Sequence, residues 1–207
     1  MDFLTGTAQN PVFNVYVDFL EGEWFNIYSA EQFISNASVN GKYIINNDLD
    51  FEGKTWPTSL MHGNFSGIIQ GNGYIFKNIT VKQTNNAKAN TGLFGQLTDK
   101  SNINDVTFEN VSLVIEGGSR VVANFGLLAG TISKDSTINK VDIKSSQIMI
   151  DSKCYFSASD FSIGLLCGAG DISKVDSFEI NCLATGENPD KVSITIDGNQ
   201  VSVIINK

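Results

Sequence analysis

Few of the side chains on which catalytic and nucleic-acid-binding sites depend are present in this sequence. Its 207 residues include a single histidine, His62, and a single arginine, Arg120, and the net charge is −8 at pH 7. Proteins that bind nucleic acids or anionic membrane surfaces need clusters of basic residues, so neither partner is expected here. One histidine also excludes Ser-His-Asp and Cys-His catalytic arrangements, unless His62 is the only base.

Cysteines and long apolar segments are scarce as well. The cysteines, Cys154, Cys167 and Cys182, have no metal-binding spacing, and the last two lie in apolar runs. We expect buried, unpaired thiols rather than a disulfide framework. No apolar run is long enough to cross a membrane. The start of the chain lacks the basic and apolar regions of a signal peptide, which predicts a protein that is either intracellular or trimmed behind its leader.

A repeat is the main feature that is present. Its copies occupy three ranges, 91–113, 125–148 and, in shorter form, 163–180. The glycines that begin these copies, Gly92, Gly126 and Gly164, lie 34 and then 38 residues apart. A period of this length is typical of architectures in which similar units stack on one another.

Each copy has the pattern of short strands. A glycine-bounded apolar run is followed by a polar turn and then by alternating apolar residues, which are Ile103, Val106 and Phe108 in one copy and Ile138, Val141 and Ile143 in the next. Alternation of this kind predicts strands and leaves no room for a long helix. Because one such unit cannot bury its own apolar face, we expect a β-solenoid in which equivalent strands of successive coils pair in parallel.

Two sets of aligned residues agree with stacking. Gly95, Ala129 and Cys167 are small residues at the same distance from the first glycine, which suggests a tight inner corner. Asn104 and Asn139 are also equivalent, and asparagine both tolerates the left-handed conformation and can hydrogen-bond to a stacked neighbour. We therefore expect an asparagine ladder, with a chance coincidence in an asparagine-rich chain as the alternative.

The chain divides into three parts. Residues 1–10 look like a leader or tag remnant, residues 11–40 like an N-terminal strand or hairpin with a short capping helix, and residues 41–207 like the solenoid. The helix is predicted after Ser29, because Gln32 follows three residues later as in a capping box. Strands are expected at YIIN, SGIIQG and YIFKNITV between residues 41 and 81, and a hairpin around Asp197-Gly198.

Several segments, taken in order, resemble the bacterial extracellular proteins with GLUG repeats. They are AEQF, Y-x-x-x-N-x-L-D-F, F-S-G-x-x-x-G-N-G-Y-x-F-x-N-I-T-V and N-T-G-L-F-G, and the resemblance covers roughly residues 27–180. It implies an all-β, right-handed parallel β-helix, here of about five coils with an N-terminal cap. It also implies a secreted or cell-surface protein, as in adhesin-like proteins and accessory regions of immunoglobulin A peptidases, with no catalytic, cofactor-binding or metal-binding residues to carry over. The shorter turn before Ile172 departs from the pattern.

One acidic segment is the only candidate for chemistry. Asp48, Asp50 and Glu52 alternate with Leu49 and Phe51, so on a strand the carboxylates share one face. They could bind calcium or a sugar hydroxyl, or act as a glycosidase pair. The alternative is the solvated face of an amphipathic strand.

The remaining polar and aromatic candidates have simpler explanations. His62 is expected in a surface turn, and the glycines Gly67, Gly71 and Gly73 form turns rather than a phosphate-binding loop. Four N-x-[ST] sequons occur, at Asn36, Asn64, Asn78 and Asn110, and are interpreted as asparagine-rich turns. Trp24, Trp56 and Tyr74 either stack on sugars or pack in the core and cap. Long turns after Leu113 and Ile148 are candidate recognition loops.

Two functions remain. The first is a non-catalytic cell-surface or secreted module that binds a glycan or protein or serves as a spacer, as a monomer or as part of a larger chain. The second is a carbohydrate-active enzyme, either a polysaccharide lyase or a glycoside hydrolase. A lyase needs a base beside a charge-neutralising cluster, and one arginine with few lysines near the acids disfavours that chemistry.

Overall fold

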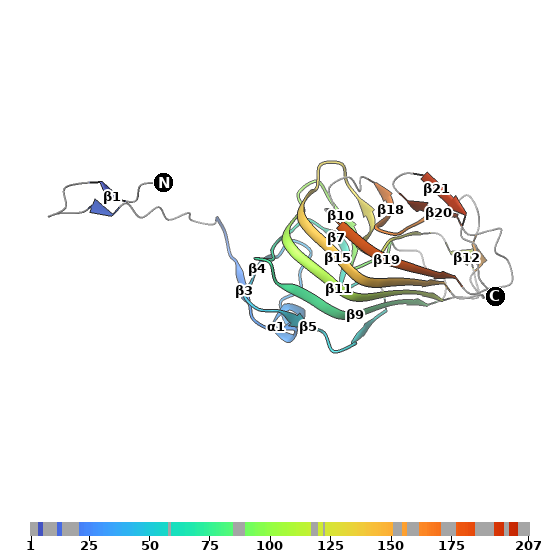
Figure 1. The fold of residues 1–207 in the computed structure, drawn as a ribbon, viewed down its shortest axis with the longest axis horizontal. Coiled ribbons are helices and arrows are strands. Elements are labelled where there is room, and N and C mark those ends of the chain that lie inside the picture. Colours follow the sequence, from blue (N-terminus) through green and yellow to red (C-terminus); the bar gives the residue numbers. More distant parts are fainter. Residues whose placement is uncertain are drawn as a thin grey trace.

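The computed structural model describes twelve segments of the chain: 4–5, 12–13, 21–57, 59–84, 90–116, 120–121, 123–150, 155–156, 162–170, 177–184, 193–196 and 199–202. These residues are mostly in strands, with one short helix (Figure 1). None of their helices is long and apolar enough to cross a membrane.

The large sheet contains nine strands that all pair in parallel. They are β3 (Phe25–Ile27), β4 (Lys42–Ile45), β5 (Leu49–Asp50), β6 (Thr55–Trp56), β8 (Ile68–Gln70), β9 (Ile75–Thr84), β11 (Asn102–Glu116), β15 (Thr137–Ile150) and β19 (Ser177–Ala184). The strands predicted at YIIN, SGIIQG and YIFKNITV are therefore confirmed as β4, β8 and β9.

A second sheet of four parallel strands lies across the molecule from the large sheet (Figure 1). It consists of β7 (Met61–Phe65), β10 (Phe94–Leu97), β14 (Ala129–Ile132) and β18 (Cys167–Gly170). A third sheet consists of β13 (Asn124–Phe125), β17 (Ser162–Gly164), β20 (Ser193–Ile196) and β21 (Asn199–Ser202). The last two pair antiparallel, as expected of the hairpin predicted around Asp197-Gly198, although these two residues lie outside the described segments; β20 also pairs in parallel with β17.

Two small pairs complete the described strands. β12 (Arg120–Val121) pairs in parallel with β16 (Tyr155–Phe156), and β1 (Leu4–Thr5) pairs antiparallel with β2 (Val12–Phe13). β2 lies in the part of the chain, residues 11–40, for which an N-terminal strand or hairpin was predicted. β3 was expected to belong to an N-terminal hairpin, but it pairs in parallel with β4 instead.

The prediction of a single right-handed parallel β-helix of about five coils is wrong. The strands are divided among several sheets, and the large sheet curls into a half-barrel (Figure 1). The physical reason is that the layers differ in length: β11 and β15 extend over 15 and 14 residues, whereas β5 and β6 have two residues each. Uniform coils cannot be built from such unequal strands.

The parallel pairing of equivalent strands is nevertheless confirmed. Along β11 and β15, each residue lies opposite the residue 35 positions later, including Ile103 opposite Ile138, Val106 opposite Val141 and Phe108 opposite Ile143. All six side chains are buried. The apolar alternation in the repeats therefore predicts both the register and the buried face of these two strands.

The predicted column of Gly95, Ala129 and Cys167 is shifted by one residue. Ala129 lies opposite Cys167, but its other neighbour is Phe94 rather than Gly95. Thr91 pairs with Phe125, 34 residues later, whereas Phe94 pairs with Ala129, 35 residues later, so the second repeat has one additional residue in between. The glycines that share a column are consequently Gly95, Gly130 and Gly168.

The long strands bend at residues in the left-handed conformation. Asn78, Asn110 and Ser145 occupy equivalent positions of β9, β11 and β15, with φ angles of 61°, 51° and 47°. Asp105 and Lys140 form a second such pair, with φ angles of 56° and 51°. Because left-handed backbone is costly for most residues other than glycine and asparagine, these positions mark where the large sheet curls.

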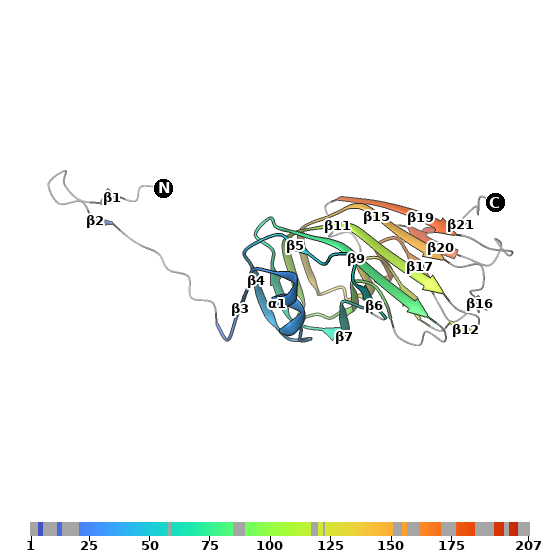
Figure 2. The same ribbon diagram turned by 90° about the horizontal axis from the view of Figure 1, so that it is seen from below.

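The predicted helix is present as α1 (Ala30–Ser35), which lies at the β3 end of the large sheet (Figure 2). Ser29 caps it by accepting a hydrogen bond from the Gln32 backbone nitrogen at 3.3 Å. The Gln32 side chain reaches back to the Tyr28 backbone nitrogen at 2.8 Å, one residue before the position expected in a capping box. Phe33 is fully buried and anchors the helix to the core.

A chain of aromatic rings connects this helix to both main sheets. The ring centroids of Phe33 and Phe76 are 5.2 Å apart, those of Phe76 and Phe108 are 5.5 Å apart, and those of Phe108 and Phe94 are 6.4 Å apart. Phe65 continues the chain, 5.1 Å from Phe94. Edge-to-face contacts of this kind stabilise the core beyond simple area burial, so α1, the large sheet and the second sheet share one interior.

Candidate functional site

The acidic segment lies on β5 and the turn that follows it. Leu49 and Phe51 are fully buried, whereas Asp48, Asp50 and Glu52 are exposed. The alternation predicted from the sequence is therefore confirmed. Glu52 has a φ angle of 53°, because the chain leaves the strand there and turns toward β6.

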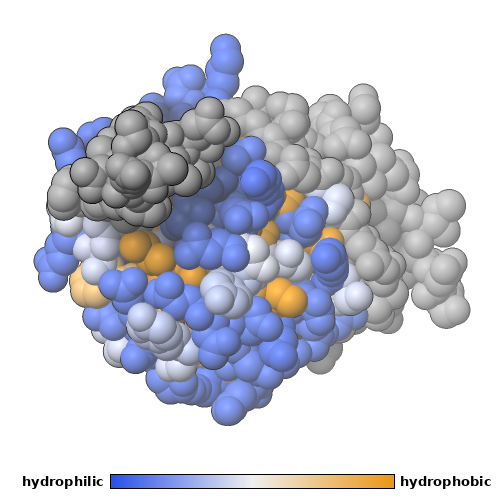
Figure 3. Space-filling view, turned by 60° about the vertical axis from the view of Figure 1, so that its left-hand side comes forward, coloured by the Kyte–Doolittle hydropathy of each residue, from blue (hydrophilic) through white to orange (hydrophobic). Residues whose placement is uncertain are grey.

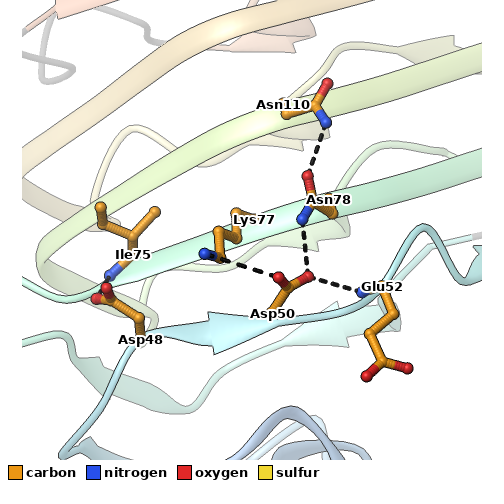
Figure 4. A network of polar contacts seen from close by, with 7 residues as sticks. All are labelled: Asp48, Asp50, Glu52, Ile75, Lys77, Asn78 and Asn110. Atoms are coloured by element: carbon orange, nitrogen blue, oxygen red, sulfur yellow. Dashed lines mark hydrogen bonds and ion pairs between the residues drawn. The ribbon is translucent and has the colours of Figure 1, made fainter.

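Two of these carboxylates are hydrogen-bonded to the backbone (Figure 4). Asp48 Oδ1 accepts a hydrogen bond from the Ile75 nitrogen at 3.0 Å, and Asp50 Oδ1 accepts one from the Glu52 nitrogen at 2.9 Å. Asp50 Oδ1 also accepts a hydrogen bond from Asn78 Nδ2 at 2.8 Å. Asp48 and Asp50 thus hold the short β5 segment against β9, which is a structural role.

The Asp50 contact begins a ladder that crosses three layers (Figure 4). Asn110 Nδ2 donates to Asn78 Oδ1 at 2.7 Å, and Asn78 Nδ2 donates to Asp50. Both asparagines are the left-handed residues at which β9 and β11 bend. Their side chains therefore hydrogen-bond between layers where the backbone changes direction. The sequons at Asn78 and Asn110 were expected to lie in turns, but both asparagines lie within strands.

Hydrogen bonding lowers the pKa of Asp50. The Asn78 amide is the largest cause, followed by the Glu52 backbone N–H, while partial desolvation opposes the effect. Lys77 also contributes, with its Nζ 3.6 Å from Asp50 Oδ2. A carboxyl group with a lowered pKa stays ionised near neutral pH, so it is poorly suited to act as a general acid.

We expect the Asp50→Asn substitution to reduce the pH dependence of stability in acid. The lowered pKa means that the folded protein binds this proton less readily than the unfolded chain. The stabilisation is therefore fully present above the ordinary aspartate pKa of about 3.9 and is lost as the pH falls through the lowered value. Urea unfolding of parent and variant between neutral and acid pH measures this. Asp135→Asn, in the exposed turn after β14, is the control, and an equal change in both variants would contradict the prediction.

A row of alternating charges runs beside this ladder. Asp50 lies opposite Lys77, Lys77 opposite Glu109, and Glu109 opposite Lys144 on successive strands of the large sheet. Opposite charges on adjacent strands stabilise a sheet by fractions of a kcal/mol per pair.

A row of amides also crosses the large sheet, nearer than the row of charges to the N-terminal ends of β11 and β15. Asn104 Nδ2 donates to Gln70 Oε1 at 2.9 Å, and Asn139 Nδ2 donates to Asn104 Oδ1 at 2.7 Å. The predicted Asn104–Asn139 ladder is confirmed, although the left-handed conformation falls on the next residues, Asp105 and Lys140. Gln70 was missed because it precedes the recognised repeats and is not an asparagine.

A third ladder of side-chain hydrogen bonds was not predicted from the sequence. Asn124 Nδ2 donates to Asn90 Oδ1 at 3.1 Å, and Ser162 Oγ donates to Asn124 Oδ1 at 2.7 Å. A β-carbon on Gly130 would lie 2.6 Å from the β-carbon of Asn90, so the glycine column makes space for this ladder. The sequence does contain a pattern that could have predicted this ladder, because a polar residue stands two positions before the first glycine of each repeat.

The other candidates are dispersed. His62 is exposed, as expected, but lies within β7 rather than in a turn. Trp56 and Tyr74 are half-buried and pack against the core. Trp24 is half-buried and lies beneath the Lys42 ammonium, with Nζ 5.8 Å from the ring centroid. Among described residues, groups of three or more His, Cys, Asp or Glu side chains that could hold a metal ion are absent.

Several predicted features lie partly outside the described residues. Cys167 is buried, but the side chains of Cys154, Cys182 and Arg120 are not described. Turns were expected after Leu113 and Ile148, but β11 continues to Glu116 and β15 to Ile150, and the residues that follow both strands lie outside the described segments. Of the remaining sequons, Asn36 follows α1 and donates to the Gln32 carbonyl at 2.8 Å, and Asn64 lies exposed in β7.

Comparisons with protein-family models, curated proteins and solved structures find no match for this chain.

Proposed function

We propose that this chain is a non-catalytic module of a secreted or cell-surface protein, which binds a glycan or a protein or separates other parts of the chain that carries it. The proposal depends on one observation, which is that two carboxylates of the acidic segment take part in hydrogen bonds that stabilise the fold. Asp48 and Asp50 accept hydrogen bonds from backbone nitrogens of β9 and of the following turn, so these groups already have a structural task. The resemblance to GLUG-repeat proteins supports a location outside the cell.

The proton-transfer properties of the described carboxyl groups also support binding over catalysis. A general acid and a general base need environments that push their pKa values apart. Among the described carboxyl groups, Asp50 and Glu31 both have lowered pKa values. For Glu31 the causes are hydrogen bonds at the start of α1, first from its own backbone and then from Ser29, with Lys54 adding to them.

A polysaccharide panel that is scored for both binding and turnover tests this proposal. We expect no new reducing ends and no unsaturated products from any substrate, with either the parent or an Asp48→Asn, Asp50→Asn double variant. Asparagine keeps the size and the acceptor oxygen of aspartate but cannot act as an acid, base or nucleophile. Turnover by the parent that disappears in the double variant would overturn the proposal in favour of a carbohydrate-active enzyme.

A further inference from the structure

The outward face of the large sheet carries an almost uncharged strip at its β3 end. The strip is formed by outward-facing residues at or beside five neighbouring strands, β3, β4, β8, β11 and β15, and its residues are Asn26, Lys42, Ile44, Asn46, Ile68, Gln70, Asn102, Asn104, Thr137 and Asn139. The intervening residues of each strand, such as Tyr43 and Ile69, are fully buried. We call this surface the amide strip.

Hydrogen bonds between strands hold five amides of the strip in place, whereas the sixth, Asn102, has its Oδ1 buried without a hydrogen-bond partner. Besides the row through Gln70, Asn104 and Asn139, Asn46 Nδ2 donates to Asn26 Oδ1 at 3.2 Å. A side-chain amide has two donor hydrogens and an oxygen with two lone pairs, so each ladder contact uses only part of its capacity. The remaining donors and acceptors form an ordered array with the strand spacing of about 4.8 Å.

The charge of the strip differs from that of the rest of the molecule. Lys42 is its only charged residue, whereas the chain as a whole carries a net charge of −8. The Lys42 ammonium donates to the Glu21 carbonyl at 2.8 Å and lies over one face of the Trp24 ring, 5.8 Å from its centroid. An uncharged ligand therefore matches the strip, and the net negative charge of the chain disfavours an anionic one.

Aromatic and aliphatic side chains accompany the amides at the β3 end. Tyr28 is 56% exposed, and Trp24, Ile44 and Ile68 are half-buried. In a space-filling view with this end brought forward, apolar atoms are interspersed with hydrophilic ones rather than gathered in one large patch (Figure 3). Aromatic faces bordered by amides offer both parts of a sugar ring a partner, because the ring has apolar C–H faces and polar hydroxyl edges.

We propose that the amide strip binds an uncharged polysaccharide, whose sugar rings stack on Trp24 and Tyr28 and whose hydroxyl groups hydrogen-bond with the amides of β4, β8, β11 and β15. This rests on the proposed function, of which it names the site and the ligand class. A chain lying across the strands meets one outward side chain per strand in each row. The β3 end supplies the apolar contact and the amide row the polar contact.

Affinity electrophoresis in gels containing single polysaccharides tests the site. The neutral probes are β-glucan, xyloglucan and mannan, and polygalacturonate is the anionic probe. We expect retardation by at least one neutral polysaccharide and none by polygalacturonate. A Trp24→Ala, Tyr28→Ala double variant, which removes the aromatic contact, and Ile68→Glu, which places a carboxylate in the strip, should each weaken binding about tenfold or more.

The control is His62→Glu, which introduces the same carboxylate on an exposed position of β7 in the second sheet. It should change affinity less than about twofold, and thermal melting establishes that each variant is folded. Undiminished binding by both folded strip variants would overturn the strip, as would binding of polygalacturonate alone or of no polysaccharide. None of these three results involves turnover, so the proposal of a non-catalytic module would stand.

Discussion

The Leu128→Asp substitution is expected to destabilise the folded protein by about 4 kcal/mol or more, because it places an unpaired carboxylate in the core. Leu128 belongs to the second repeat, is fully buried, and lies between the first repeat and the third. Its backbone nitrogen donates to the Leu166 carbonyl at 3.0 Å, and its carbonyl accepts from Phe94 at 2.9 Å, so the position cannot move outward without breaking contacts between layers. Urea unfolding at neutral pH measures the loss.

Two further variants identify the cause of this loss. Leu128→Ala keeps the site apolar and should cost about 2–5 kcal/mol through the cavity that it leaves. Thr137→Asp introduces the same carboxylate on an exposed position of β15 and should change stability by less than about 1 kcal/mol. If Leu128→Asp melted within a degree or two of the parent, the assignment of this residue to the core would be wrong.

The Gly126→Ala substitution is expected to cost about 3 kcal/mol through steric overlap with the backbone. A β-carbon at Gly126 would lie 2.2 Å from the α-carbon of Cys167 and 2.5 Å from the carbonyl oxygen of Leu166. Neither atom belongs to a flexible side chain, so relief of the overlap requires separation of neighbouring layers. Thermal and urea unfolding of the variant measure the effect.

Gly73→Ala is the matched control for this effect. Gly73 has a φ angle of 78°, so alanine is strained there, but a β-carbon would have no atom within 4 Å. We expect a cost of about 1 kcal/mol, from backbone conformation alone. A Gly126→Ala variant no less stable than Gly73→Ala would show that the close approach of the layers is not as the structure has it.

Local pattern predicted the strands and their buried faces better than their arrangement in sheets. The alternation of Ile103, Val106 and Phe108 reflects burial on one face, and burial is what the sequence encodes directly. The division into several sheets depends on where strands stop and bend. Those points are residues such as Lys140 and Ser145, whose left-handed conformation is unusual for their residue types and is imposed by the neighbouring layers.

Small shifts in the register between strands could not be predicted from the sequence either. The leading glycines Gly92 and Gly126 suggested one alignment, but a single additional residue changes it before Phe94 meets Ala129. Since side chains alternate between the two faces of a strand, an error of one residue exchanges interior and exterior positions. The strand β7 was also missed, because its sequence MHGNF has a polar centre and resembles a turn.

The candidate site could be predicted only as a set of exposed groups. Alternation placed Asp48 and Asp50 on the outside correctly, but their partners, Ile75 and Asn78, are 27 and 28 residues away in the sequence. The pairing of β5 with β9 determines these contacts, and local pattern contains no information about that pairing. The amide strip was missed because its residues come from five separate strands.

The alternating charges of the large sheet have a consequence for how the chain avoids misfolding. Repeat proteins are prone to misassembly during folding, and one way for similar repeats to pair wrongly is to skip a layer. If β11 were skipped, Lys77 would face Lys144, and if β9 were skipped, Asp50 would face Glu109. Like charges on adjacent strands repel, so both of these errors are disfavoured while the native order is not. The row of alternating charges therefore favours assembly of the layers in their native order.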